Sequence, residues 1–356
     1  MNVEPTNTPA ISGLRPYLAR VADGDLLTAA EAEDAFATIM SGSATHGQIG
    51  AFLMALRVRG ESVEELTGAA RAMRAKATRI AAPPGAIDTC GTGGDGADTL
   101  SISTAVSLVV AACGVPVAKH GNRAASSRAG AADVLKELGV NIDAATDVTE
   151  TCLRTAGIGF LFAPKYNSAM KHVAPVRQEL GVRTIFNLIG PLTNPAGATR
   201  QLLGVFAERW IVPLAETLGH LGSESAWVVH GSDGLDEITT TGPTKIAKLQ
   251  RKSDGSFAVS TFEIVPEDAG LKRARIEDLK GGDAAHNAAA LRTLIHGRGG
   301  PYRDIVVLNS AAALMVADKA ADLKAGAAIA LDAIMSGKAA KTLATLVALS
   351  NGKSAP

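Results

Sequence analysis

A glycine-rich loop followed by hydroxyl-bearing residues is the first segment whose residue types could do chemistry. Residues 88–96 read DTCGTGGDG, and the helix predicted behind them has Ser101, Ser103 and Thr104 in its first turn. Glycines let backbone N–H groups converge on an anion, and a helix N-terminus adds partial positive charge. The pattern therefore predicts a phosphate cradle, although it has neither a Walker A ending nor GxGxxG spacing. A flexible turn capped by Asp95 is the alternative.

A second polar segment, residues 119–128, reads KHGNRAASSR and also follows a predicted strand. It brings together a lysine, two arginines, an asparagine and two serine hydroxyls. Lysine and arginine bind phosphate oxygens, and ligands of α/β proteins gather at the carboxyl ends of parallel strands. The segment therefore predicts a second phosphate contact, with a solvated basic turn as the alternative.

A pair of adjacent carboxylates, Asp236 and Glu237, ends the segment SDGLDE at residues 232–237, after another predicted strand. Mg²⁺ in proteins takes one or two carboxylates together with substrate phosphates and water. The pair therefore predicts a metal position. An acidic pair at the start of a helix is the alternative.

A fourth segment, residues 177–195, reads RQELGVRTIFNLIGPLTNP. Arg177 and Arg183 could bind an organic carboxylate through paired hydrogen bonds. The Gly-Pro and Asn-Pro steps near its end are rigid turns that could form a pocket wall. Surface arginines beside structural turns are the alternative.

The elements that must position these segments fall into two groups, and the first 80 or so residues predict helices only. Three capping-box patterns open these helices, each with a hydroxyl residue three positions before Glu or Gln. The pairs are Thr28 with Glu31, Thr45 with Gln48, and Ser62 with Glu65. Apolar periodicity follows each pair, and Gly42 and Gly60 stand where helices end. A further short helix is expected at residues 15–21, so this part reads as a small all-helical domain.

From residue 86 the pattern alternates between strand and helix. Strands are expected at 86–88, 115–118, 158–162, 202–206, 226–230 and 304–308, and helices at 101–113, 132–138, 147–157 and 168–180, the last kinked at Pro175. A polar segment at 251–262 predicts an antiparallel excursion, and helices are expected from about residue 285. This alternation predicts a larger α/β domain with a mainly parallel central sheet flanked by helices.

Composition narrows the classes of function. The chain has 356 residues, which suggests about two domains. Its 35 Lys and Arg residues balance 35 Asp and Glu residues, which speaks against a general duplex-binding protein. Aromatic residues are only 4%, which speaks against stacked-base platforms. We therefore expect small-molecule partners and no nucleic acid.

The cysteines and the apolar segments indicate the compartment. Cys90, Cys113 and Cys152 are scattered without CxxC spacing, which predicts reduced thiols in a cytoplasmic protein rather than a zinc site or a disulfide framework. No basic-then-apolar segment begins the sequence, so no signal peptide is expected. The most apolar stretch, residues 105–118, is broken by a glycine and a proline, so no membrane span is expected.

Taken together, the four segments resemble those of the anthranilate phosphoribosyltransferases, enzymes of tryptophan biosynthesis. GTGGD, KHGNRAASS, GVRTIFNLIGPLTNPA and DGLDE occur in that family's order, and the resemblance covers nearly the whole chain. It implies a nucleoside phosphorylase/phosphoribosyltransferase-like fold: a helical domain at 1–82, joined in space by helix 168–190, and an α/β phosphoribosyl-binding domain at 86–356. It also implies a cytoplasmic, Mg²⁺-dependent homodimer that associates through the helical domain, with two Mg²⁺ ions accompanying phosphoribosyl pyrophosphate (PRPP).

The resemblance also implies a role for individual residues. Those expected to act in catalysis are Lys119, Asp236 and Glu237, and those expected to hold metal are Ser103, Asp236 and Glu237. The residues expected to contact PRPP are Gly91, Gly94, Asp95, Thr99, Ser101, Ser103, Thr104, Lys119, Asn122, Arg123, Ala124, Ala125, Ser126 and Ser127. The residues expected to contact anthranilate are Gly91, His120, Asn122, Asn167, Arg177 and Gly190.

Three positions depart from the family's usual pattern. Ser101 stands where an asparagine usually precedes Ile-Ser-Thr, which shortens one expected pyrophosphate contact. Asn167 stands where the family usually has a histidine along the anthranilate route, and it cannot carry charge. Ala131 stands where a serine often follows the basic loop. These departures bear on substrate affinity more than on the type of reaction.

The implied reaction is displacement of pyrophosphate from C1 of PRPP by the amine of anthranilate, giving N-(5-phosphoribosyl)anthranilate. We expect no dedicated general base, because an aryl amine is neutral at pH 7 and pyrophosphate can take its proton. Two alternatives are a pyrimidine nucleoside phosphorylase, which would use phosphate and no metal, and a non-catalytic paralogue that binds nucleic acid. The carboxylate pair speaks against the first alternative, and the balanced charge speaks against the second.

Overall fold

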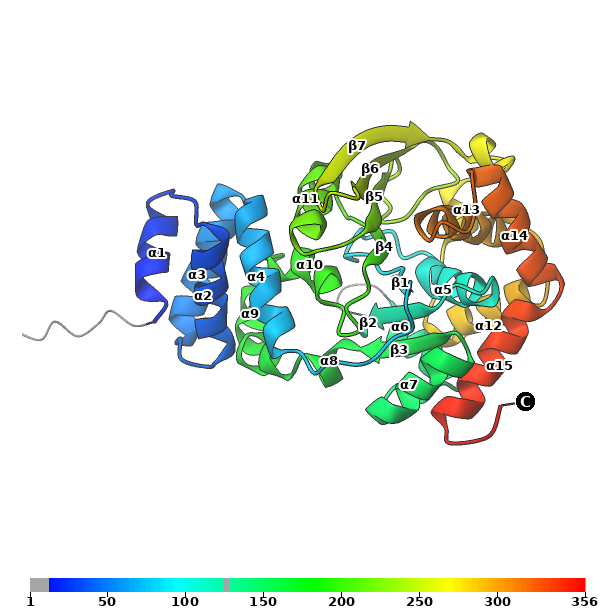
Figure 1. Ribbon diagram of the computed structural model, residues 1–356, viewed down its shortest axis with the longest axis horizontal. Coiled ribbons are helices and arrows are strands. Elements are labelled where there is room, and N and C mark those ends of the chain that lie inside the picture. The colour runs from blue at the N-terminus through cyan, green and yellow to red at the C-terminus, as the bar shows by residue number, and fades with distance from the viewer. Residues whose placement is uncertain (1–12, 125–127, 356) are drawn as a thin grey trace, which may run out of the picture. The chain divides into compact units, whose positions relative to one another are not determined.

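A computed structural model describes residues 13–124 and 128–355, which form two compact units (Figure 1). The first unit consists of the described residues up to 76 together with residues 168–189. The second consists of residues 77–167 and the described residues from 190 onward. The chain thus leaves the first unit after residue 76, returns to it for one short segment, and leaves it again after residue 189.

The first unit is all-helical, as expected. Its elements are α1 (Arg15–Ala22), α2 (Ala29–Met40), α3 (His46–Arg59), α4 (Val63–Lys76), the 3-10 helix Ser168–His172, α9 (Ala174–Leu180) and α10 (Phe186–Ile189). Helices α1 to α4 lie alongside one another (Figure 1). The ring of Phe36 packs edge-on against Phe52 at 5.7 Å and against Phe186 at 5.6 Å between centroids. These contacts bring the returning segment into the core of the bundle.

The three predicted capping boxes are confirmed. The hydroxyls of Thr28 and Thr45 accept from the backbone N–H three positions ahead, and the Glu or Gln side chains reach back to the caps. The third box closes through Glu65, whose carboxylate accepts from the N–H of Ser62 at 2.9 Å. These hydrogen bonds satisfy N–H groups that a helix start leaves unpaired.

The helix predicted across residues 168–180 is broken rather than kinked. A 3-10 helix ends at His172, and α9 begins at Ala174 with Pro175 in its first turn. Proline lacks an N–H donor and disfavours helical geometry in the residue before it, but it fits the first turn of a new helix. Proline therefore starts α9 here instead of bending a longer helix.

The second unit is built on a seven-stranded sheet in the order β3-β2-β1-β4-β5-β6-β7. The strands are β1 (Ile87–Asp88), β2 (Val117–Gly121), β3 (Ile158–Phe162), β4 (Arg200–Gly204), β5 (Ser225–Gly231), β6 (Thr244–Arg251) and β7 (Phe257–Ile264). Strands β1 to β5 pair in parallel, while β6 and β7 form an antiparallel hairpin at the edge. The mainly parallel sheet and its antiparallel excursion are thereby confirmed.

Helices cover both faces of this sheet. They are α5 (Ile102–Ala112), α6 (Ala131–Glu137), α7 (Thr146–Thr155), α8 (Ala163–Tyr166), α11 (Ile211–His220), α12 (Ala284–Ile295), α13 (Pro301–Val316), α14 (Leu323–Met335) and α15 (Lys338–Ser350). Short 3-10 helices span Gly190–Thr193, Glu208–Trp210, Pro266–Ala269 and Ile276–Leu279. Helices α5, α12, α13, α14 and α15 gather on one face, and α11 packs against β5 to β7 on the other (Figure 1). No helix of the described residues is long and apolar enough to cross a membrane.

The strand predicted at residues 304–308 is wrong, because these residues lie inside α13. Pro301 occupies the first turn of the helix, and the residues from Ile305 to Leu314 are all buried. A run that is apolar on every side gives no helical periodicity, so a short window of it resembles a buried strand. Only the full sixteen-residue length of α13 distinguishes the two.

The helical unit has a buried carboxylate whose removal should be costly. Glu65 is fully buried, accepts from the N–H of Leu27 at 3.0 Å, and pairs with the guanidinium of Arg59. We expect Glu65→Ala to lower the free energy of unfolding of this unit by about 3 kcal/mol, because it leaves buried donors unpaired. Urea denaturation followed by circular dichroism measures this loss. Glu64→Ala, which removes an exposed bond to Ala29, is the matched control, and equal losses in the two variants would contradict the account.

Candidate active site

Three of the predicted segments, the glycine-rich, basic and acidic ones, lie at the carboxyl ends of parallel strands. The glycine-rich loop follows β1, and Asp236 and Glu237 follow β5. Lys119 and His120, predicted as loop residues, lie within β2 and are buried. The ammonium of Lys119 donates to the carbonyl of Thr89 at 2.8 Å, so it lies directly beneath the glycine-rich loop. The strand therefore presents a fixed positive charge to this loop.

Asp236 ties the acidic segment to the glycine-rich loop. Its Oδ2 accepts from the backbone N–H of Gly93 at 2.7 Å. A Cβ at Gly91 would lie 2.3 Å from the same oxygen, and a Cβ at Gly204, at the end of β4, would lie 1.6 Å from the carbonyl oxygen of Asp236. Side chains at these two glycines would push the acidic segment off the sheet. The glycines thus allow the loop and the carboxylate to approach each other.

The side chains of Asp95, Asp236 and Glu237 form a half-buried group of like charges. Burial and the neighbouring Asp95 raise the pKa of Asp236 to about 8. Burial and the charge of Asp236 raise the pKa of Glu237 well above its usual value, against the opposite effects of Lys119 and of the Ser103 backbone N–H. Carboxylates held so close ionise together only when a cation lies beside them. The predicted metal residues Ser103, Asp236 and Glu237 are therefore brought together in a setting that fits a divalent cation.

Protein side chains alone do not complete a metal shell in this setting. Among the described residues, no three His, Cys, Asp or Glu side chains form a ready-made metal cluster. Mg²⁺ usually keeps water and takes phosphate oxygens beside one or two carboxylates. The arrangement therefore fits a metal that arrives with a phosphorylated ligand better than one held permanently by the chain.

The rest of the predicted phosphate cradle is braced from the C-terminal part of the chain. Thr99 forms an isolated antiparallel bridge with Lys280, whose ammonium donates to the carbonyl of Ala97 at 2.6 Å. Ser101 accepts at its carbonyl from the hydroxyl of Tyr302 at 3.0 Å. The start of α5, with Ser103 and Thr104 in its first turn, is thereby held from two directions.

One carboxylate binds both ends of the basic segment that follows β2. Asp133, in the first turn of α6, accepts from the N–H groups of Ala124 and Gly130, both at 3.1 Å, and pairs with Arg123 at 3.2 Å. A Cβ at Gly130 would lie 2.3 Å from the nitrogen of Ala124, so the backbone at residues 124 and 130 is in close contact. Asn122 is exposed and accepts from the Arg123 N–H. The predicted PRPP residues Ala125, Ser126 and Ser127 lie outside the described residues.

Beneath the basic segment lies a buried polar network that the sequence reasoning missed. The carboxylate of Asp88 accepts from the His120 backbone N–H at 3.2 Å, from the Asn194 amide at 2.7 Å and from the Cys90 thiol at 3.2 Å. It joins β1, β2 and the Asn-Pro turn at one point. The charge of Asp88 in an otherwise apolar strand was its only sequence signal. The His120 ring is buried without a partner for Nε2 in the described part of the chain, and burial lowers its pKa, so it is neutral at pH 7.

The residues expected to contact anthranilate are divided between the two units. Gly91, His120, Asn122, Asn167 and Gly190 belong to the α/β unit, and Arg177 belongs to the helical unit. Asn167 is buried, and its Oδ1 has no partner among the described residues. A Cβ at Gly190 would meet open space. Arg177 lies over the ring of Phe186 at 5.6 Å.

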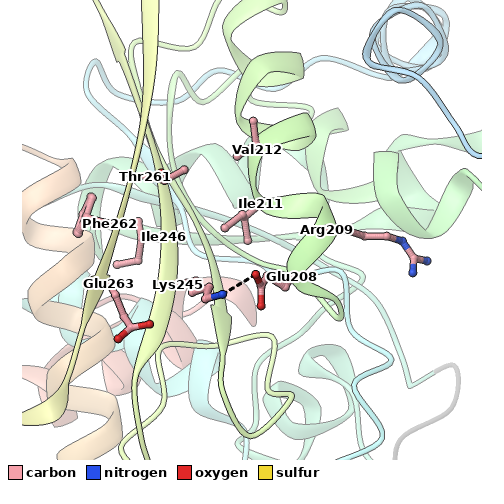
Figure 2. Close-up of a pocket in the computed structure, with 9 residues that line it drawn as sticks. All are labelled: Glu208, Arg209, Ile211, Val212, Lys245, Ile246, Thr261, Phe262 and Glu263. Carbon is pink, nitrogen blue, oxygen red and sulfur yellow. Dashed lines mark hydrogen bonds and ion pairs between the residues drawn. The ribbon is translucent and has the colours of Figure 1, made fainter.

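A separate groove lies between the start of α11 and the β6–β7 hairpin (Figure 2). It encloses about 530 Å³, and its lining includes Ile211, Ile246 and Phe262. Lys245 there donates to Glu208 at 2.7 Å, so this pair of charges is already satisfied (Figure 2). None of the residues that line this groove belongs to the four charged segments.

Comparison with known proteins agrees with both units. The helical bundle domain of a glycosyl transferase family matches residues 15–77, and the a/b domain of the same description matches residues 83–340. The anthranilate phosphoribosyltransferase of Rhodospirillum rubrum is 61% identical over 98% of this chain and 98% of its own, and that of Parvibaculum lavamentivorans is 60% identical over 96% and 99%.

Solved structures of such enzymes have the same fold. The crystal structure of anthranilate phosphoribosyltransferase from Thermus thermophilus has a TM-score of 0.88 and 42% identity, covering 94% of this chain and 99% of that one. The enzyme of Saccharomyces cerevisiae in complex with PRPP and Mg has a TM-score of 0.86 and 25% identity, covering 95% of this chain and 98% of that one.

The half-buried carboxylates make the stability of the fold depend on pH in a defined direction. Folding raises the pKa of Asp236 from about 4 to about 8, so the folded chain binds an extra proton in that window and stability falls as pH rises through it. The Asp236→Asn variant cannot ionise at this position. We expect its free energy of unfolding at pH 8 to be higher than that of the unsubstituted protein (the parent) by on the order of 2 kcal/mol. The difference should shrink toward pH 5.

Urea unfolding between pH 5 and pH 8, with EDTA present, measures this difference. Asp23→Asn, at an exposed helix end, is the control and should show no such pH dependence. A parent that gains stability relative to Asp236→Asn as pH rises would show that the carboxylate is not held in this way.

Proposed function

Because the chain belongs to the anthranilate phosphoribosyltransferase family, we propose that it transfers the phosphoribosyl group of PRPP to the amine of anthranilate. The products are N-(5-phosphoribosyl)anthranilate and pyrophosphate, in a step of tryptophan biosynthesis. The observation that carries the proposal is the hydrogen bond between the Gly93 N–H and Asp236, which joins the glycine-rich loop to a half-buried carboxylate pair. Pyrophosphate with a divalent cation has the charges that such a junction requires.

The chain's own groups bind PRPP from three sides in this proposal. The backbone N–H groups of the glycine-rich loop and the first turn of α5 face the pyrophosphate, with Gly91, Gly94, Asp95, Thr99, Ser101, Ser103 and Thr104 contributing. Lys119 supplies a fixed positive charge beneath the loop, which stabilises the charge that develops as pyrophosphate leaves. The basic segment from Asn122 to Ser127 binds the remaining phosphate oxygens.

The metal in this proposal is Mg²⁺, as two ions, held through Ser103, Asp236 and Glu237. Bound Mg²⁺ neutralises charge on the pyrophosphate leaving group. The carboxylates lose their protons when the cation binds, and this reverses the raised pKa values of Asp236 and Glu237.

Anthranilate is proposed to bind through Gly91, His120, Asn122, Asn167, Arg177 and Gly190. Arg177 suits its carboxylate, because a guanidinium pairs with a carboxylate through two parallel hydrogen bonds. His120 is buried and neutral, so its ring is suited to hydrogen bonding and not to charge pairing. No residue needs to take the proton of the amine, since the departing pyrophosphate accepts it.

We also propose that the enzyme is a cytoplasmic homodimer that associates through its helical unit. Leu26, Val58 and Val182 of this unit expose 58%, 81% and 49% of their surface. Exposed apolar side chains that gather into one patch favour association with another surface. The cysteines Cys90, Cys113 and Cys152 are all free, as suits a reducing compartment.

The activity is tested by following anthranilate fluorescence with purified protein, PRPP and Mg²⁺. We expect loss of fluorescence that requires PRPP and stops with EDTA, and no turnover by the double variant Asp236→Ala/Glu237→Ala at ordinary Mg²⁺. The double variant should fold, because it removes like charges that lie close together. Turnover by it would contradict the metal assignment. Phosphorolysis of a pyrimidine nucleoside in the presence of EDTA would instead favour a nucleoside phosphorylase.

The absence of a general base predicts the behaviour of His120. We expect His120→Gln to raise the KM for anthranilate and to keep kcat within about tenfold of the parent, because lost hydrogen bonding costs about 1 kcal/mol. Steady-state kinetics with varied anthranilate separates the two constants. A variant that binds both substrates and loses the chemical step would show that His120 moves a proton.

A further inference from the structure

Helix α13 contains a buried asparagine that the proposed reaction does not use. Asn309 has no exposed surface, and its side-chain amide is fully engaged. Its Oδ1 accepts from the N–H of Ile238 at 2.9 Å, and its Nδ2 donates to the carbonyls of Ile238 at 2.7 Å and Ile305 at 2.9 Å. Ile238 follows Glu237 directly. One side chain thus holds both backbone polar groups of the residue next to the carboxylate pair.

Packing alone does not explain an asparagine at this position. Its neighbours in α13 include Val306, Leu308 and Ala312, all buried, and asparagine is a poorer helix former than leucine. A buried amide is tolerated only when its polar atoms are paired, and here two of its three hydrogen bonds end on one residue 71 positions away. The hydrogen bonds of this side chain therefore stabilise the acidic segment more than they stabilise the helix.

The same face of α13 also holds the phosphate cradle. Tyr302 lies seven positions before Asn309, which is two helical turns, so both side chains project from one side of the helix. The Tyr302 hydroxyl donates to the carbonyl of Ser101 at 3.0 Å, at the start of the helix that carries Ser103. One rigid helix therefore contacts both segments from which the proposed metal residues come.

We propose that Asn309 is a positioning residue that sets the direction of Asp236 and Glu237 toward the phosphate cradle. The inference rests on the proposed function, because it concerns the metal of that reaction. In this proposal Asn309 touches neither substrate nor metal and acts through the backbone of Ile238. Without Asn309, the N–H and the carbonyl of Ile238 both lose their partner, and the carboxylate pair is free to turn.

The acidic segment has a second anchor, so loss of Asn309 should loosen it without unfolding it. Asp233 accepts from the hydroxyls of Thr239 and Thr241 at 2.6 and 2.7 Å, which closes the segment on the far side of the carboxylates. Leucine has the same branched arrangement of heavy atoms as asparagine, although its two methyl groups are larger than the amide oxygen and nitrogen, and it suits the apolar surroundings. Asn309→Leu therefore removes the hydrogen bonds and keeps the shape of the side chain.

The test compares Asn309→Leu with Ser310→Ala. Ser310 is the next residue on the helix, is fully buried, and its hydroxyl has no partner in the described part of the chain. Free Mn²⁺ is followed by electron paramagnetic resonance in the presence of PRPP and the absence of anthranilate. We expect the Mn²⁺ dissociation constant of Asn309→Leu to rise by about tenfold, the effect of one or two lost hydrogen bonds. Ser310→Ala should match the parent.

Kinetics gives an independent readout. The Mg²⁺ concentration for half-maximal rate should rise in parallel for Asn309→Leu, while the KM for anthranilate stays within about twofold. If the leucine variant does not fold, Asn309→Ser is measured instead, with the same expectation. A folded variant that binds Mn²⁺ like the parent overturns the proposal.

The inference and the proposed function fail in different ways. A parent that binds Mn²⁺ with PRPP but transfers nothing to anthranilate contradicts the proposed function, and Asn309 is still judged by Mn²⁺ affinity. A parent that binds no Mn²⁺ in the presence of PRPP overturns both.

Discussion

Like charges held close together at a half-buried site are the constraint on which the rest of this structure depends. Asp95 raises the pKa of Asp236, and both of them raise the pKa of Glu237, in surroundings that already disfavour ionisation. Lys119 supplies one positive charge and leaves the group short of cations. Such a site is stable with protons bound or with a divalent ion bound, and it is unfavourable when empty and ionised. The proposed chemistry uses the second state.

The surrounding backbone is arranged to keep these carboxylates in place. Gly91 and Gly204 leave no side chain between the sheet and Asp236, so the acidic segment rests directly on β4 and the glycine-rich loop. Asn309 and Asp233 fix the segment on either side. The repulsion between the closely spaced carboxylates is thus offset by several hydrogen bonds. Each of these bonds is modest in energy and satisfies a polar group that would otherwise be unpaired.

The sequence was sufficient to predict those features that depend on interactions between residues close together in the chain. The capping boxes at Thr28 and Thr45, the alternation of strand and helix, and the charged segments were all readable, because each depends on residues a few positions apart. The strand expected inside α13 was wrong, because a helix buried on every side loses its periodicity. Asp88 and Asn309 were missed, since their partners Asn194 and Ile238 lie 106 and 71 positions away. The roles assigned to individual site residues stay predictions.

The most direct test of the account is where a divalent ion binds when PRPP is present. Crystals grown with Mn²⁺ and PRPP give an anomalous signal that locates the ion without reference to activity. The account predicts Mn²⁺ bound between the pyrophosphate and the side chains of Asp236, Glu237 and Ser103. Pyrophosphate bound in the glycine-rich loop, with Mn²⁺ absent from these carboxylates or held by other side chains, would contradict it.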